Sequence, residues 1–217
     1  LGGMLVQRGD YAQAIDTLRI ALTLRPTEVI YLNLGTAYFN SGRLEEAVAA
    51  YNQALQFGFA SYLMWINLGD AYFWLPGRRT QAAEAYGEAV RLAREESARL
   101  AEARRAPDPM MLAWLSTTYS RLGQADSARV YLAHALRADS TNSQVEHCAA
   151  LTLWQLGDRA AAIAWLAKAA RNGYPLTWIR DSPMFQEWRE EEAFRALIAG
   201  AGPGTRQSGS PAGGGRT

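Results

Sequence analysis

The sequence predicts an all-α solenoid of about five helix–turn–helix repeats that ends in a C-terminal helical cap. An alanine followed seven residues later by a second alanine recurs along the chain, and the first alanines of these pairs are spaced 33, 35, 46 and 34 residues apart. A period near 34 residues with two helical runs per unit is typical of solenoids, in which each unit packs on its neighbours. The pairs are Ala14 with Ala21, Ala47 with Ala54, Ala82 with Ala89, Ala128 with Ala135, and Ala162 with Ala169.

Small residues mark the places where paired helices are expected to approach closely. In the second unit, apolar and small residues recur at three- and four-residue spacing, the pattern of two amphipathic helices joined by a short turn. Gly35, Ala47 and Ala54 fall on the facing sides of these helices, where a larger side chain would push the backbones apart. We expect a bulky replacement at such a position to lower the free energy of unfolding by about 1–3 kcal/mol.

Two later helix starts carry capping sequences. Asp108 followed by Pro109 offers an N-cap and a first-turn proline. Ser143 with Glu146 three residues later has the spacing of a capping box. Helices are therefore expected to begin at both places.

One interval is longer than the others. The 46 residues between Ala82 and Ala128 exceed the period, and the surplus lies in residues 93–106, which contain no helix breaker before Pro107. This surplus predicts a helix over residues 79–106 that is longer than its counterparts by about 18 Å. The extension is either a solvated projection or an arm that binds a partner or a second copy of the chain.

The repeat period stops after Gly173. The apolar residues from Tyr174 to Ile198 form shorter segments split by two prolines, which would cover the exposed apolar face of the last repeat. The final residues are rich in Gly, Ser, Pro and Arg and are expected to be disordered. The expected divisions are a solenoid over 1–174 with units 1–27 (truncated at its start), 28–61, 62–107, 108–142 and 143–174, capping helices over 175–199, and a disordered tail over 200–217.

The third unit carries a recognisable motif. Its residues are Trp65, Leu68, Gly69, Tyr72, Ala82, Tyr86 and Ala89. This pattern resembles the tetratricopeptide repeat family, and the resemblance covers about residues 1–173. It implies a right-handed α–α superhelix that holds protein partners and has no catalytic role of its own.

The same resemblance implies a binding surface. In this family the first helix of each unit lines the concave face, through positions fixed relative to the glycine of the Leu-Gly pair. The groove residues implied here are Leu32, Thr36, Phe39, Asn40, Ile66, Asp70, Phe73, Trp74, Thr117, Arg121, His147, Leu151 and Trp154. Such a groove is apolar and aromatic with little charge. It would hold a partner segment or the upstream region of the same chain, or its residues would serve packing alone.

A narrower resemblance involves residues 67–72, Pro76–Arg79, the lengthened helix, and the segment from Ser182 to Phe194. These features are similar to the C-terminal repeat region of bacterial signalling proteins, including eukaryotic-type serine/threonine kinases and TolB-like or cyclase-like multidomain proteins. The resemblance implies a catalytic or sensing domain upstream of Leu1. Because Leu1-Gly2 matches a Leu-Gly pair in the middle of a repeat, the chain is expected to begin inside one.

Several classes of function are disfavoured by composition. A net charge of +1, with mixed signs along the helices, offers no basic surface for nucleic acid or an anionic membrane. No apolar run reaches the roughly 20 residues of a transmembrane helix, and no signal-like stretch is present, which favours the cytoplasm over export. His134, Glu146, His147 and Cys148 are too sparse for a metal or nucleophilic site, and no phosphate-binding glycine loop occurs. We therefore expect no cofactor and no enzymatic activity in these residues.

Overall fold

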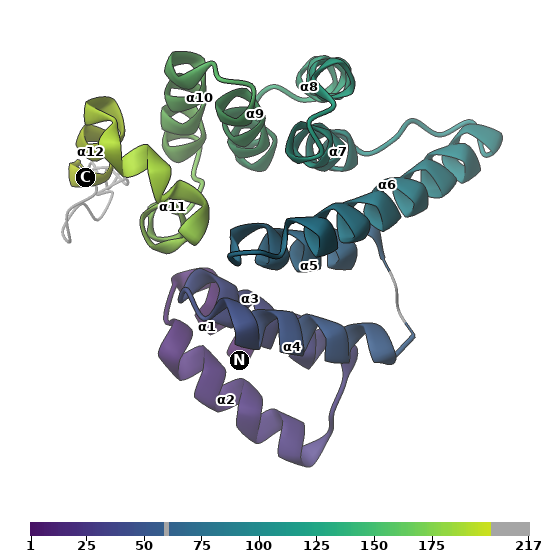
Figure 1. Ribbon diagram of the computed structural model, residues 1–217, viewed down its shortest axis with the longest axis vertical. Helices are drawn as coiled ribbons and strands as arrows, with labels where there is room; N and C mark the ends of the chain where they lie inside the picture. Colours follow the sequence, from purple (N-terminus) through teal and green to yellow (C-terminus); the bar gives the residue numbers. More distant parts are fainter. Residues whose placement is uncertain (59–60, 201–217) are drawn as a thin grey trace, which may run out of the picture.

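A computed structural model describes residues 1–58 and 61–200. The described residues contain helices and no strand, and consecutive helices pack as pairs, α1 with α2 through to α9 with α10. The predicted fold class, a right-handed superhelix of paired helices with a C-terminal helical cap, is confirmed (Figure 1). The helices are α1 (Gly2–Arg8), α2 (Tyr11–Leu24), α3 (Glu28–Asn40), α4 (Leu44–Gln56), α5 (Tyr62–Trp74), α6 (Arg79–Glu102), α7 (Pro109–Arg121), α8 (Ala125–Ala138), α9 (Ser143–Gln155), α10 (Arg159–Arg171), α11 (Leu176–Asp181), the 3-10 helices η1 (Pro183–Phe185) and η2 (Glu187–Glu190), and α12 (Glu192–Ala199).

One expected helix cap is confirmed and the other is wrong. Asp108 caps α7 by accepting a hydrogen bond from the backbone N–H of Met110 at 2.9 Å. At α9 the cap is Asn142 rather than Ser143, because the Asn142 side chain accepts hydrogen bonds from the backbone N–H groups of Gln144 and Val145. Glu146 forms no capping box; its buried carboxylate accepts hydrogen bonds from Asn172 Nδ2 at 2.8 and 2.9 Å.

The close approach of helices at glycine is visible in two units. A Cβ atom added at Gly35 would lie 2.5 Å from Cε1 of Tyr51, and one added at Gly69 would lie 2.6 Å from Cδ1 of Tyr86. Both tyrosine rings are buried between the two helices of their units. The glycines therefore make room for an aromatic ring from the second helix of each pair, and sterics require a residue without a Cβ atom at both positions.

Gly69→Ala is expected to lower the free energy of unfolding by about 1–3 kcal/mol, because the new methyl group must displace the buried Tyr86 ring. Gly87 in α6 provides the matched control, since it is exposed and a Cβ there would meet no atom within 4 Å. Gly87→Ala should raise the free energy of unfolding by about 0.5–1 kcal/mol through helix propensity. Urea unfolding measures both; a stabilised Gly69→Ala variant would show that the interface yields to the added group.

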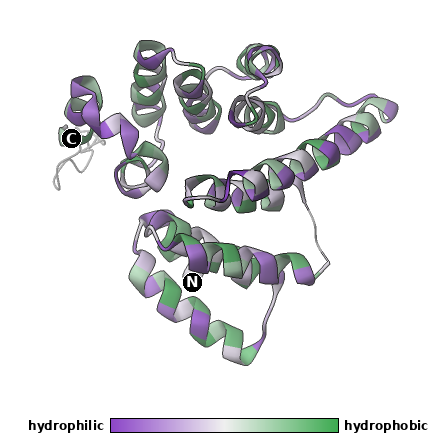
Figure 2. Ribbon diagram, viewed as in Figure 1, coloured by the Kyte–Doolittle hydropathy of each residue, from purple (hydrophilic) through white to green (hydrophobic). Residues whose placement is uncertain are grey.

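Helix α6 is long, as expected, but it ends at Glu102 and not at residue 106. Arg104 adopts a left-handed conformation with φ of 53°, and the N–H of Arg105 bonds to the carbonyl of Leu100 at 2.8 Å, which closes the last turn. Pro107 also disfavours helical backbone at the residue that precedes it, Ala106. Figure 1 shows α6 extending past α5, and Figure 2 shows hydrophilic residues along this extension.

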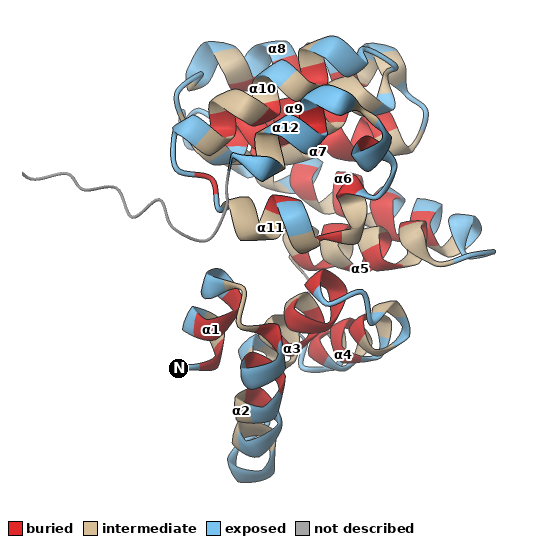
Figure 3. Cartoon of the chain, turned by 90° about the vertical axis from the view of Figure 1, so that its left-hand side faces the viewer, coloured by how far each residue is buried: buried red, intermediate tan, exposed pale blue. Residues whose placement is uncertain are grey.

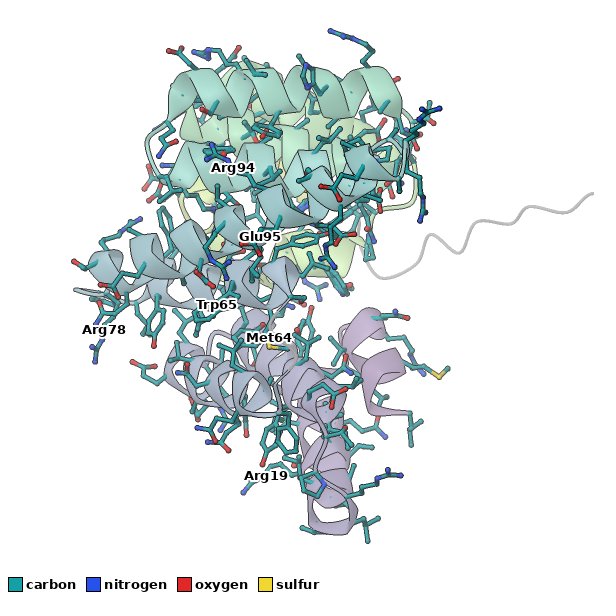
Figure 4. All side chains as sticks on the ribbon, turned by 90° about the vertical axis from the view of Figure 1, so that its right-hand side faces the viewer. Arg19, Met64, Trp65, Arg78, Arg94 and Glu95 are labelled. Carbon is teal, nitrogen blue, oxygen red and sulfur yellow. The ribbon has the colours of Figure 1, made fainter. Side chains whose placement is uncertain are left out.

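Side chains of α5 and α6 connect the N-terminal units to the rest of the stack. Met64 of α5 is buried, and Trp65 packs against the apolar cluster of the first two units (Figure 4). Val90 and Ala93 of α6 pack against Met111 and other apolar residues of α7. The middle of the long helix therefore forms an interface with the next unit, and Leu100 near its end packs against the same cluster.

The C-terminal cap contacts both ends of the superhelix. Phe185, Trp188 and Phe194 are buried against α9 and α10, which covers the apolar face of the last repeat. Trp178 of α11 also reaches α1, where its Nε1 donates a hydrogen bond to the carbonyl of Val6 at 3.3 Å. Figure 1 places α11 between α10 and the α1–α3 region, and Figure 3 shows buried residues where these elements face one another. The expected tail lies outside the described residues from 201 onward.

Candidate functional site

The concave face contains a cavity of about 320 Å³ between the first helices of the repeats and the cap. Helices α3, α5, α7 and α9 line it from one side, and the segment from Tyr174 to Phe185 lines it from the other. Most of the lining side chains are apolar or aromatic. The predicted groove residues in this lining are Leu32, Thr36, Phe39, Asn40, Ile66, Asp70, Thr117, His147 and Leu151.

The remaining predicted residues lie beside a second, smaller hollow of about 80 Å³. Phe73, Trp74, Arg121 and Trp154 line it together with residues of η2. The structure therefore brings all the predicted groove positions to the concave face. They line two cavities, with Leu151 in the lining of both, and their part in binding stays a prediction.

The opposite charges of two predicted groove residues neutralise each other. Arg121 of α7 forms an ion pair with Asp70 of α5, and the two side chains are only 5% and 15% exposed. Tyr86 OH donates a hydrogen bond to Asp70 Oδ1 at 2.6 Å and accepts one from Arg121 Nη1 at 2.8 Å. Burial raises the pKa of the Asp70 carboxyl, although the charge of Arg121 and the hydrogen bond from Tyr86 act in the opposite direction. This network joins the third and fourth units and leaves no free charge for a ligand.

His147 is a buried, neutral member of the lining. Its ring stacks on Tyr174 of the cap with centroids 4.1 Å apart and an interplanar angle of 11°. Burial, and then the positive charge of Arg121, lower the pKa of His147 to about 3. Its Nε2 atom is buried and has no hydrogen-bond partner among the described residues. The imidazole is therefore uncharged at neutral pH.

Cys148, another titratable side chain of the lining, is also uncharged. Burial raises the pKa of the Cys148 thiol to about 12, which keeps it protonated at neutral pH. Within residues 1–58 and 61–200, no three His, Cys, Asp or Glu side chains are grouped in a way that could hold a metal ion. Among the described helices, none combines the length and the apolar character needed to cross a bilayer. The lining is thus suited to contact and burial rather than to proton transfer.

Two sequence models, both described as tetratricopeptide repeat, match the chain. One matches residues 1–61 and again 32–96, and the other matches residues 111–142, so that together they cover more than half of the chain. The chain belongs to the tetratricopeptide repeat family. The matched segments contain α1 to α5, α8 and most of α6 and α7. The Gly–Tyr contacts of α3–α4 and α5–α6 described above lie within them.

This tetratricopeptide repeat protein is similar to other proteins over different lengths. The peroxisomal targeting signal receptor of Eremothecium gossypii is 40% identical over 57 residues, which are 26% of this chain and 10% of that receptor. The Cut9–Hcn1 hetero-tetramer of the APC/C has a chain with a TM-score of 0.54 and 16% identity, covering 90% of this chain and 37% of that one. A MamA structure has a TM-score of 0.46 and 19% identity, covering 79% and 94%. At 16% identity the Cut9–Hcn1 chain shows the fold alone.

In this repeat protein, aromatic groove residues are engaged by neighbouring side chains. Trp154 stacks on Trp188 of the cap with centroids 4.1 Å apart, and Phe73 packs beneath the guanidinium of Arg79 at 3.6 Å. Trp74 meets the Phe73 ring edge-on at 5.3 Å. These rings contribute to packing between units and with the cap, so the aromatic surface open to a ligand is smaller than the sequence pattern indicates.

The cap residues of the cavity could not be found from the repeat pattern. Tyr174, Trp178 and Met184 follow the last repeat and line the cavity. Their aromatic or apolar character indicated only that they pack in the cap. Further lining comes from the early turns of first helices, at Leu63 of α5 and Met110 of α7. Leu63 lies one helical turn before Ile66 and Met110 two turns before Thr117, and helical spacing is the signal that would have included them.

Proposed function

We propose that this protein is a non-catalytic interaction scaffold and that the concave cavity binds a segment of a protein partner. The observation that carries the proposal is the cavity itself, which four first helices line with apolar side chains. Among the described lining residues only Asp70 is charged, and it is already paired. Membership of the tetratricopeptide repeat family supports a role in holding proteins. The curated relative that matches 57 residues is named as a receptor for a targeting signal, which is also a recognition role.

The contact surface extends beyond the cavity. Half-buried apolar residues at its margin, among them Leu32, Leu63, Met110 and Trp114, would cover the flanks of a bound segment. Interfaces of this kind derive most of their affinity from a few apolar anchors in a desolvated pocket, with the surrounding contacts excluding water. The partner segment is therefore expected to insert at least one side chain into the cavity.

A peptide selected from a random display library against the purified chain is expected to bind in the cavity. Leu63→Ser should weaken binding by about tenfold or more, measured by fluorescence anisotropy of the labelled peptide, because Leu63 lines the cavity and remains half-exposed. Val130→Ser is the matched control, since Val130 is 52% exposed on α8 and does not line the cavity. Equal affinities in the two variants would place the peptide elsewhere and contradict the proposal.

A second candidate function is a regulatory or docking region of a larger bacterial signalling enzyme, such as a serine/threonine protein kinase, with its catalytic domain upstream of Leu1. The features that favour it are residues 67–72 and the segment from Ser182 to Phe194, which are similar to the C-terminal repeat regions of such proteins. In that case the upstream region itself is a candidate occupant of the groove. A glycine-rich loop, a strand lysine and a His-Arg-Asp segment in the upstream coding sequence would support it, and their absence would count against it.

A further inference from the structure

We infer that the contact between α11 and the end of α1 is a latch, which must open before a partner segment can lie along the concave face. This inference rests on the proposed function and adds the regulation of the same site. Three observations carry it: the closed cavity is too small for such a segment, the cap crosses the concave side, and the contact that closes that side is slight.

The superhelix consists of two halves, α1–α6 and α7–α12, which are joined on one side. In the second half α7 and α9 pack closely on each other, whereas α5 and α7 do not (Figure 1). The halves are joined instead where Val90 and Ala93 of α6 pack against Met111 of α7, and by the ion pair of Asp70 with Arg121. Figure 1 places the α6–α7 joint at the right of the molecule and α11 at the left.

The latch lies on the side away from this joint, where α11 meets the end of α1 (Figure 3). The half-buried Trp178 donates its Nε1 hydrogen bond to the carbonyl of Val6 at 3.3 Å, and a Cβ atom added at Gly9 would lie 3.2 Å from Cβ of Thr177. Within residues 1–58 and 61–200, no ion pair and no backbone hydrogen bond joins α1 to α11. A contact of this size can break while each half stays folded.

The cap remains with the last repeat when the latch opens. Tyr174, which precedes α11, stacks on His147 of α9, and Phe185, which follows α11, is buried in the apolar cluster of α9 and α10. Ile179 of α11 is also completely buried in this cluster. Both flanks of α11 are thus held by the second half, so that opening separates α11 from α1 and widens the concave face.

The closed cavity is smaller than a segment that the first helices could hold together. Packed helix axes lie about 8–10 Å apart, so a segment that contacts α3, α5, α7 and α9 spans about 30 Å, or about nine extended residues. The cavity of about 320 Å³ lies at the lower end of the range for small-molecule sites. Trp178 and Met184 line it and also pack against the apolar cluster of the first two units, which places them across the path of such a segment.

The test locks the latch with a disulfide between Gly9→Cys and Thr177→Cys. Their Cβ atoms are near the separation of about 3.5–4.5 Å that a disulfide requires, and Cys148, the one native cysteine, is buried. A display-selected peptide of about nine residues or more should bind the oxidised chain at least about tenfold more weakly than the reduced chain, measured by fluorescence anisotropy. Dithiothreitol should restore the affinity, and the wild-type chain should bind equally with and without it.

Several results would overturn the inference. Equal or tighter binding by the oxidised chain would do so, as would failure of the two cysteines to pair in the folded variant, because the contact would then be absent in solution. If a side chain at Gly9, whose φ is 82°, prevents folding as judged by circular dichroism, nitroxide labels at Ala12→Cys and Ala196→Cys replace the lock. The distance between these exposed positions on α2 and α12 should lengthen when the peptide binds, and an unchanged distance would contradict the latch.

The two proposals fail in different ways. If Leu63→Ser does not weaken the selected peptides, the concave cavity is not the binding site and the proposed function fails. If the peptides require Leu63 and yet bind the oxidised chain as tightly as the reduced chain, only the inference about the latch fails. The Leu63→Ser measurement therefore comes first, and the locking experiment follows.

Discussion

Trp188→Ala is expected to lower the free energy of unfolding by about 3–5 kcal/mol, the range for removal of a fully buried large aromatic side chain. Trp188 is 1% exposed, stacks on Trp154 at 4.1 Å, and meets the Phe185 ring edge-on at 5.1 Å. Its removal would leave a void between the cap and the last repeat. Urea or thermal unfolding followed by circular dichroism measures the loss.

The control for this prediction is Phe57→Ala. Phe57 is 46% exposed and contacts Tyr31 at 5.7 Å, so the same kind of truncation should change the free energy of unfolding by less than about 1 kcal/mol. Because Trp178 bonds the cap to the carbonyl of Val6, Trp188→Ala should also lower amide hydrogen-exchange protection in α1. A loss below 1 kcal/mol for Trp188→Ala would mean that the cap contributes little to stability.

Arg121→Met is expected to lower the free energy of unfolding by about 3–5 kcal/mol, because it leaves the buried carboxylate of Asp70 without its counter-ion. The double variant Asp70→Leu with Arg121→Met should recover most of this loss, since replacement of a whole buried ion pair by apolar side chains is often close to neutral. Tyr86 would then lose its two charged partners, so the recovery should be incomplete. A double-mutant cycle of urea unfolding measures the coupling.

Arg99→Met serves as the surface control for the ion-pair prediction. Arg99 pairs with Glu96 on the projecting part of α6, where its side chain is 73% exposed, and its replacement should leave the free energy of unfolding almost unchanged. If Arg121→Met costs no more than Arg99→Met, the Asp70–Arg121 pair does not hold the third and fourth units together.

Local features of the fold were predictable because each depends on residues close in sequence. Gly35 and Gly69 mark the close approach of paired helices, and the tyrosines they accommodate, Tyr51 and Tyr86, lie in the next helix of the same unit. The wrong prediction of the helix cap of α9 was also local. Asn142 and Ser143 are adjacent residues that both favour an N-cap, and the repeat pattern does not choose between them.

The candidate site was predictable to a smaller extent. The position of Leu32, Ile66 or His147 within its repeat sets the face of the helix on which it lies, and that face lines the cavity. The pairing of Asp70 with Arg121 joins residues 51 positions apart in different units, and no periodicity in the sequence predicts it. The availability of a charged residue for a ligand is therefore decided by packing.

The sequence by itself determined the helical repeats, the small residues between paired helices, and the helix faces that point to the concave side, because these follow from helical periodicity within about 34 residues. Only the tertiary structure decided that Trp178 closes the concave side against Val6, 172 residues away, and that the groove becomes a cavity bounded by the cap. The physical reason is that small rotations between successive units add up along a superhelix, so the proximity of its two ends depends on all the interfaces between them.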